Sequence, residues 1–136
     1  MTGRYARIAL VAVASVVLLA GCATGPGAAE PGSIAEKSYR GLPEQAAVEA
    51  LEQPLVTPLG GSRFALTLWG SSSCPRIPTA ITTDGAEVLV QLAESGGEVC
   101  TADMAPMTHE LLSPVPPPFT VAVELDGIRS EVGTVS

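Results

Sequence analysis

Residues 81–92 have the sequence ITTDGAEVLVQL, and this stretch decides the fold. The pair Asp84-Gly85 separates two segments that contain β-branched and aliphatic residues, which is a strong signal for a tight β-hairpin. After the pair, Val88, Val90 and Leu92 fall at every second position. Because successive side chains of a strand point to opposite faces, these residues share one face and are expected to lie in a core. The stretch therefore predicts two antiparallel strands.

The same signals extend in both directions along the chain. Residues 63–68 (RFALTL) and 119–125 (FTVAVEL) alternate in the same way, and a second pair, Asp126-Gly127, follows. The strand before Asp84 contains Pro78, which has no N–H to donate and therefore favours a sheet edge. Residues 99–104 and 108–112 are predicted as further strands. We thus expect an all-β fold, a small antiparallel β-sandwich with an immunoglobulin-like layout of six or seven strands.

Two proline-containing segments interrupt the strand pattern. Residues 43–53 begin with a proline that suits the first turn of a helix and are followed by Pro54, so a short helix is predicted there. Residues 114–118 (PVPPP) predict an extended connector in the polyproline II conformation. Such a run could dock on an aromatic groove of a partner protein. A passage between two sheets is the favoured interpretation.

The N-terminal residues carry a different kind of signal. Arg4 and Arg7 precede an uninterrupted run of apolar and small residues over residues 8–20. A membrane-spanning helix needs about 20 apolar residues, so this shorter run has the dimensions of a signal-peptide core. The run leads into Leu19-Ala20-Gly21-Cys22, which resembles the lipobox of bacterial lipoproteins. The resemblance implies a lipoprotein precursor that is cleaved before Cys22 and lipidated on its sulfur; the alternative is an ordinary secretory signal with an incidental cysteine.

This resemblance sets the expected organisation of the chain. Residues 1–21 are a cleaved signal peptide, 22–42 a lipid-anchored flexible tether, 43–58 a short helix and linker, and 59–136 the β-sandwich. The expected location is the extracytoplasmic face of the cell membrane, reached through the acylated Cys22. Two or more acyl chains give stable anchoring, whereas one gives only marginal binding.

The charge of the chain limits the classes of partner. Residues 1–21 hold two of the seven Lys and Arg residues and none of the 14 Asp and Glu residues, so the mature chain has a net charge of −9. This acidic balance argues against binding to nucleic acid, whose phosphates need a basic surface, and against electrostatic adhesion to anionic lipid. No cofactor is indicated. A protein of the cell envelope remains as a candidate partner.

Two cysteines, Cys74 and Cys100, remain once Cys22 is lipidated. Exported domains lie in an oxidising compartment, and small ones with thin cores often depend on a disulfide. If both cysteines are oxidised within one chain, they must pair with each other. The predicted strand directions place them at the same end of one sheet. Because Trp69 precedes both cysteines instead of lying between them, we predict a sandwich but not a member of the immunoglobulin family.

The segments around these cysteines are the most distinctive in the chain. Residues 69–75 are WGSSSCP, and residues 100–108 are CTADMAPMT. Together they resemble the WGSSxCP and CTxDxxPxT segments of small secreted or lipid-anchored actinobacterial proteins of unassigned function, over residues 60–125 of this chain. The resemblance implies no catalytic residues. The physical interpretation is structural: Trp69 covers the disulfide, the serines cap loop backbone groups, and Asp103 accepts hydrogen bonds from turn amides.

Copper binding is the main functional alternative. Met104, Met107 and His109 place two thioethers and an imidazole within six residues, and soft thioethers suit Cu(I). The structural alternative is that the methionines fill gaps beside a proline and that His109 faces solvent.

Serine hydrolase chemistry is a more remote alternative. The segment Ser71–Ser73 offers hydroxyls, His109 is the only histidine, and Asp84 or Asp103 could orient it. The GxSxG elbow of α/β-hydrolases is absent, and the CxxC pair of thiol redox sites is also absent. The sequence therefore favours a noncatalytic binding or interaction module in a cell-envelope lipoprotein.

Overall fold

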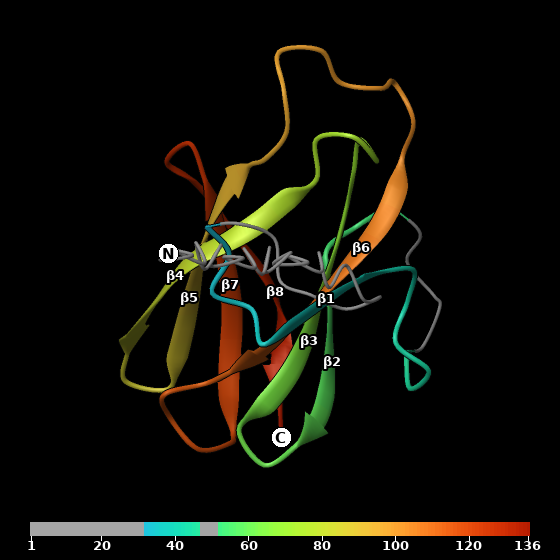
Figure 1. Ribbon diagram of the computed structural model, residues 1–136. Helices are drawn as coiled ribbons and strands as arrows, with labels where there is room; N and C mark the ends of the chain where they lie inside the picture. The colour runs from blue at the N-terminus through green and yellow to red at the C-terminus, as the bar shows by residue number, and fades with distance from the viewer. Residues whose placement is uncertain (1–31, 47–51) are drawn as a thin grey trace, which may run out of the picture.

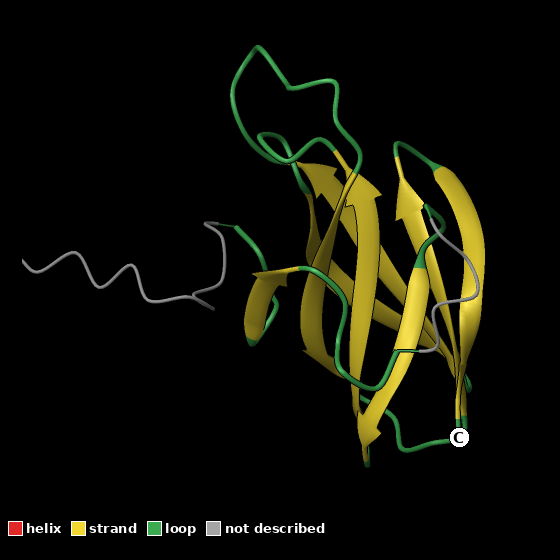
Figure 2. Ribbon diagram, turned by 90° about the vertical axis from the view of Figure 1, so that its right-hand side faces the viewer, coloured by secondary structure: helices red, strands yellow, loops and turns green. Residues whose placement is uncertain are grey.

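A computed structural model describes residues 32–46 and 52–136. The regular secondary structure in these residues consists of β-strands, with no helix. The strands are β1 (Lys37–Arg40), β2 (Leu55–Gly60), β3 (Arg63–Gly70), β4 (Arg76–Asp84), β5 (Glu87–Glu94), β6 (Ala105–Leu112), β7 (Phe119–Leu125) and β8 (Ile128–Val135). They form two sheets with the orders β1-β6-β3-β2 and β4-β5-β7-β8. The sheets pack face to face (Figures 1 and 2). The predicted all-β sandwich is therefore confirmed.

Both Asp-Gly pairs lie at hairpins. Asp126 and Gly127 form the turn between β7 and β8, with φ angles of 52° and 77°. A type I′ turn requires this left-handed backbone at both central positions, and Asp and Gly adopt it more readily than most residues. In the first hairpin Asp84 still pairs with a residue of β5, so the turn lies one position later than predicted, at Gly85-Ala86.

The two proline signals are also consistent with the topology. Pro78 lies in β4, which forms one edge of its sheet, and the β4–β5 ladder is irregular between Pro78 and Ala80. Residues 114–118 connect β6 in one sheet to β7 in the other. The polyproline run is therefore the passage between sheets that the sequence favoured.

The number and direction of the strands differ from the prediction. The described residues form eight strands instead of six or seven, and β5 pairs with β7 in parallel, so the second sheet is mixed. The parallel pair arises because the chain leaves this sheet after β5, forms β6 in the other sheet and then returns. The first strand pairs with the sixth, whereas an immunoglobulin domain pairs its first strand with its second. The layout is immunoglobulin-like only in its two packed sheets.

Residues 99–104 do not form the predicted strand. They belong to the loop over residues 95–104 between β5 and β6, where Val99 is 87% exposed. The strand prediction fails here because this segment passes from one sheet to the other. Its backbone is held by side chains of a neighbouring loop and not by a strand ladder.

The sandwich begins earlier in the chain than predicted. β1 lies within the residues expected to form the tether, and β2 lies mostly within the expected helix and linker. The described ends of the predicted helix over residues 43–53 contain turns and a bend, and residues 47–51 lie outside the described part. The signal peptide, Cys22 and the tether up to residue 31 lie outside it as well. Within the described residues, no helix is long and apolar enough to cross a membrane.

The core fills the space between the sheets. Phe64 of β3 and Phe119 of β7 meet edge to face, with ring centroids 5.7 Å apart, a favoured geometry for aromatic pairs. The other buried apolar members of this core are Ala35, Leu66, Leu68, Val88, Val90, Leu111, Val121, Val123 and Val135. Except for Ala35, which precedes β1, they come from strands of both sheets, which accounts for the alternation seen along the sequence.

The loops gather at the two ends of the sandwich. One end, which we call the disulfide end, holds the loop over residues 71–75, the loop over residues 95–104 and the β7–β8 hairpin (top of Figure 1). The other end holds the β2–β3 and β4–β5 hairpins and the polyproline connector. The distinctive cysteine segments thus lie at one end of the molecule.

Candidate functional site

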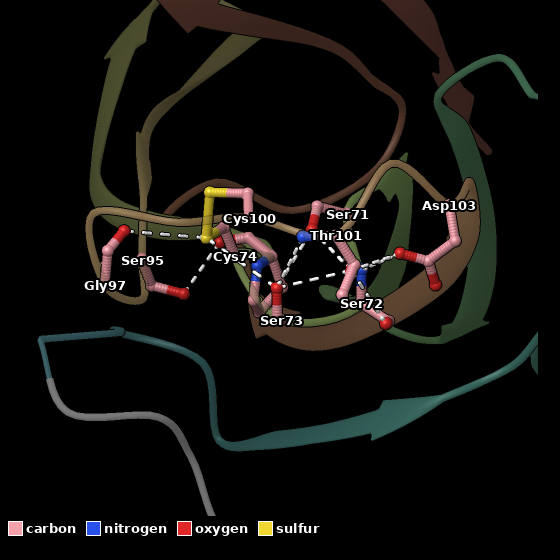
Figure 3. The surroundings of a disulfide bond; sticks show 10 residues. Ser71, Ser72, Ser73, Cys74, Ser95, Gly97, Cys100, Thr101 and Asp103 are labelled. Carbon is pink, nitrogen blue, oxygen red and sulfur yellow. Dashed lines mark hydrogen bonds between the residues drawn. A yellow bond between two sulfur atoms is a disulfide. The ribbon is translucent and has the colours of Figure 1, made fainter.

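The two cysteine segments meet at the disulfide end (Figure 3). Cys74 and Cys100 form the predicted disulfide, with their Cα atoms 5.5 Å apart. Cys74 is buried, and Cys100 is exposed. The bond joins the loop that follows β3 to the loop that precedes β6. Because each of these loops passes from one sheet to the other, the disulfide braces two crossings at once.

Hydroxyl groups add a second link between the same loops. Thr101 Oγ1 lies 3.0 Å from Ser71 Oγ, 3.3 Å from Ser72 Oγ and 3.2 Å from Ser73 Oγ. Ser73 Oγ also accepts a hydrogen bond from the Thr101 N–H at 2.9 Å. A serine therefore caps a loop backbone group, as predicted. The group that it caps belongs to the other cysteine segment.

Asp103 carries the negative charge of this cluster. Its Oδ1 accepts hydrogen bonds from the Thr101 hydroxyl and from the Ser72 N–H, the latter at 3.1 Å. These bonds, first from Thr101 and then from Ser72, favour the ionised carboxylate and lower the pKa of Asp103 to about 2. The sequence indicated that Asp103 would accept turn amides. It could not show that the Ser72 amide comes from the opposite loop.

Gly96 is a structural residue of this site that the sequence analysis missed. Its φ is +106°, and a Cβ at this position would lie 2.5 Å from the Ser73 carbonyl oxygen and 2.9 Å from Cys74 Sγ. The same turn brings the Gly97 carbonyl oxygen to 3.7 Å from Cys74 Sγ. Trp69, which the sequence analysis expected to cover the disulfide, is buried in β3 and pairs with Pro106 of β6. The only signal in the sequence was the Gly96-Gly97 pair.

The remaining residues of the second segment bind the chain that follows β1. The Pro106 carbonyl accepts the Gly41 N–H at 3.0 Å. Thr108 Oγ1 donates to the Gly41 carbonyl at 2.6 Å and lies 2.8 Å from Thr67 Oγ1. Pro106 and Thr108 of this segment thus bind backbone and hydroxyl groups of neighbouring strands and loops. They form a brace between the two loops and the chain that follows β1.

His109 is fully buried, which contradicts the expectation that it faces solvent. Its Nδ1 lies 2.8 Å from Ser38 Oγ, and its Nε2 lies 2.9 Å from the Arg76 carbonyl oxygen. A carbonyl can only accept, so Nε2 carries a proton and donates it, and in the neutral ring Nδ1 accepts the Ser38 hydroxyl. The imidazole therefore joins β1 and β6 of one sheet to β4 of the other.

The candidate copper ligands occupy different environments. Met107 shares a face of β6 with His109, because their partners Leu68 and Leu66 share a face of β3. Met104 lies in the preceding loop and is 56% exposed. A copper ion on His109 would have to displace one of the two groups that already bind the ring. Among the described residues, no group of three or more His, Cys, Asp and Glu side chains could hold a metal ion.

The serine hydroxyls and the histidine named for serine catalysis do not meet. The hydroxyls of Ser71–Ser73 bond to the Thr101 side chain, whereas the His109 ring bonds to Ser38 inside the sandwich. Asp84 ends β4 beside the β4–β5 turn, at the opposite end from the disulfide. A nucleophile and its base must lie within hydrogen-bond reach. The structure does not assemble the predicted Ser, His and Asp set.

A cavity of about 460 Å³ opens between the sheets at the disulfide end. Small-molecule sites commonly have volumes of about 300–1,000 Å³. Its apolar lining comes from both sheets and consists of Leu68, Leu92, Val123, Leu125, Ile128 and Val132, with Pro54 beside them. Its polar lining consists of Gln53, Arg76, Asp126, Ser130 and Glu131. The sequence analysis missed this cavity because its lining residues are spread over almost 80 positions of the chain.

Neither a family model, nor a curated protein, nor a solved structure matches this chain. A function for the sandwich must therefore be argued from its site geometry, since a fold alone does not imply a function.

Proposed function

We propose that the chain is a cell-envelope lipoprotein, anchored through Cys22, whose β-sandwich is a noncatalytic binding module with its site in the cavity between the sheets. The observation that carries the proposal is a cavity of about 460 Å³ with a predominantly apolar lining at the braced end of the sandwich. Concave, mostly apolar sites with a few polar groups are typical of small-molecule binding. A disulfide and a hydroxyl cluster hold the adjacent loops, which lowers the entropy that binding would cost.

The polar groups at this end support binding over catalysis. The hydroxyls of Ser71, Ser73 and Thr101 bond to one another, and Asp103 accepts hydrogen bonds from this cluster. The hydrogen bonds of these groups therefore join the two loops to each other. A catalytic serine needs a base beside its hydroxyl, and the imidazole proposed for that role, His109, bonds to Ser38 inside the sandwich.

The anchor rests on the lipobox residues Leu19 to Cys22 and is tested by substitution. We expect Cys22→Ala to move the exported protein from the detergent phase to the aqueous phase in a detergent phase separation, because the substitution removes the thiol that accepts the lipid. Thr24→Ala, which leaves the lipobox intact, is the control and should stay with the detergent. If the Cys22→Ala protein still partitions with detergent, the proposed anchor is wrong.

The binding site is tested in the aqueous Cys22→Ala protein with the neutral apolar dye Nile red. Ser130 is exposed and lines the cavity, so Ser130→Trp should obstruct it without displacing a core side chain. Thr134→Trp on the same strand is the matched control, because Thr134 is exposed and does not line the cavity. We expect saturable dye fluorescence that Ser130→Trp abolishes and Thr134→Trp keeps. Absence of saturable binding, or equal binding by both variants, would reject the cavity as the site.

A further inference from the structure

Arg76 is an unusual side chain for the interior of a sandwich. It is the first residue of β4 and pairs with Glu94 of β5. Glu94 lies two positions after Leu92 and therefore on the same, inward face of β5. Because paired residues share a face, Arg76 also lies on the inner face of the sheet. It is half-buried and lines the cavity beside Leu68 and Leu92. A guanidinium is always charged and offers a planar fork of donors for a carboxylate or phosphate. The cavity therefore contains a permanently charged guanidinium next to apolar side chains.

The other cations among the described residues already have partners. Lys37 and Arg63 bind Glu110, and Arg129 binds Glu87. Arg40 donates to the Ser72 carbonyl. Within residues 32–46 and 52–136, no carboxylate forms an ion pair with Arg76 at the distances seen for these pairs. Glu94 lies opposite Arg76 in the β4–β5 ladder but is exposed and forms no ion pair with it, so the Arg76 guanidinium is available to an anion from outside the chain.

The backbone beneath Arg76 is held on both sides. Its own carbonyl accepts the hydrogen bond from His109 Nε2. The preceding carbonyl, of Pro75, accepts two bonds, from the Ser95 N–H at 2.9 Å and the Ser95 hydroxyl at 2.7 Å. A side chain on a fixed backbone loses less entropy when it binds. The buried histidine and the disulfide loops thus position the arginine.

The acidic side chains of the cavity lie on its other side. Asp126 and Glu131 belong to the β7–β8 hairpin and to β8, and β8 is separated from β4 by two strands. At about 4.8 Å between neighbouring strands, the two edges are roughly 14 Å apart. Apolar side chains of β5 and β7, Leu92 and Val123, lie between them. The cavity thus has a site for an anion at Arg76, on one edge of the sheet, and an apolar floor formed by Leu92 and Val123 that extends towards the other edge.

We infer that the cavity binds a single-chain amphiphile with a carboxylate head, a fatty-acid-like molecule, with the carboxylate on Arg76 and the chain across Leu92 and Val123. This inference rests on the proposed binding function and names the ligand class of that site. Charge complementarity selects the head group, because Arg76 is the basic residue of the lining. The apolar floor selects a hydrocarbon body, since burial of each methylene contributes about 0.8 kcal/mol.

The test compares dodecanoate with dodecanol, each below its aggregation concentration, by calorimetric titration of the aqueous Cys22→Ala protein. We expect dodecanoate to bind at least about tenfold more tightly, which corresponds to about 1.4 kcal/mol. Arg76→Gln should weaken dodecanoate binding about tenfold and leave dodecanol binding unchanged, whereas Arg76→Lys should retain part of the preference. Arg129→Gln, which removes a cation outside the cavity lining, is the control and should change neither.

Equal binding of the acid and the alcohol, or dodecanoate binding that is indifferent to Arg76→Gln, would overturn the inference. Such a result would leave the proposed function standing if Nile red still bound and Ser130→Trp still blocked it. If neither dodecanoate nor Nile red bound, both proposals would fail, and a protein partner at the cell envelope would become the leading hypothesis.

Discussion

At the scale of single residues, Gly96 shows how one missing methyl group fixes a loop. Its left-handed φ of +106° is rare for residues with a side chain, and its hydrogen atoms face the Ser73 carbonyl and Cys74 Sγ. A methyl group would need the backbone or the disulfide to move. Neither is the far end of a flexible side chain, so the contact cannot be relieved at little cost.

We therefore expect Gly96→Ala to lower the free energy of unfolding by about 2–4 kcal/mol, the sum of backbone strain and overpacking. The neighbouring Gly97 is the matched control, because nothing lies within 4 Å of a Cβ there and its φ is not left-handed. Urea titrations of the two variants give the comparison. A loss for Gly96→Ala no larger than that for Gly97→Ala would show that the loop adapts.

His109 shows what residue-level reading of the sequence missed. Its type and spacing fitted either a soft-metal ligand or an exposed side chain, and the structure places it fully buried between Ser38 and Arg76. Both partners lie far from it along the chain. A single histidine on an alternating strand does not reveal which groups face it across a sandwich.

At the scale of elements, Asp103 links two loops by hydrogen bonds that need its charge. Its pKa falls from 3.8 to about 2 in the folded protein because Thr101 and Ser72 donate to the ionised form. A carboxylate with a lowered folded-state pKa contributes stability that is fully present above the unfolded pKa and is lost as the pH falls towards the folded value. The contribution of Asp103 is therefore lost between about pH 4 and pH 2.

Asp103→Asn should be less stable than the parent near neutral pH, and the difference should shrink as the pH falls from 4 to 2. Asp84→Asn, at an exposed carboxylate outside this cluster, serves as the control. The measurement is the unfolding free energy from urea titrations at a series of pH values. A stability difference between Asp103→Asn and the parent that does not change across that range would refute the assigned role of the charge.

The elements also show which predictions the sequence could support. Alternation along residues 63–68 and 119–125, together with two Asp-Gly pairs, was sufficient for β3, β7 and the hairpins, because those signals are local. The loop over residues 95–104 was misassigned as partly strand because its structure depends on contacts with residues 71–75. β1 was missed because a strand of four residues carries too little pattern, and its ladder partner β6 lies about 70 positions later.

At the scale of the whole molecule, the sandwich class was predictable and the crossing pattern was not. A count of short alternating strands implies two packed sheets, since each apolar face must be buried. β5 and β7 pair in parallel because β6, which lies between them in the sequence, belongs to the other sheet. The local sequence does not indicate to which sheet a strand belongs. The cavity, which lies between the sheets at the disulfide end, was invisible for the same reason.

The hydrogen bonds of His109 couple the two sheets directly, and this coupling can be measured. His109→Phe would retain an aromatic ring in the core but leave the buried Ser38 hydroxyl without this partner and remove the bond to the Arg76 carbonyl. Loss of a buried partner costs about 1–3 kcal/mol for the group left behind. We expect His109→Phe to lower the free energy of unfolding by at least that amount in urea titrations.

The control is a double-mutant cycle with Ser38→Ala, which removes the hydroxyl that the first substitution would leave unsatisfied. The double variant should be less destabilised than the sum of the two single variants, because contacting residues are energetically coupled. Hydrogen exchange should also accelerate at the start of β4, where the Arg76 carbonyl loses its bond to the opposite sheet. Additive effects together with unchanged exchange at β4 would mean that His109 fills space without tying the sheets, and the β4–β5 ladder and the Pro75–Ser95 bonds would then hold Arg76 in place.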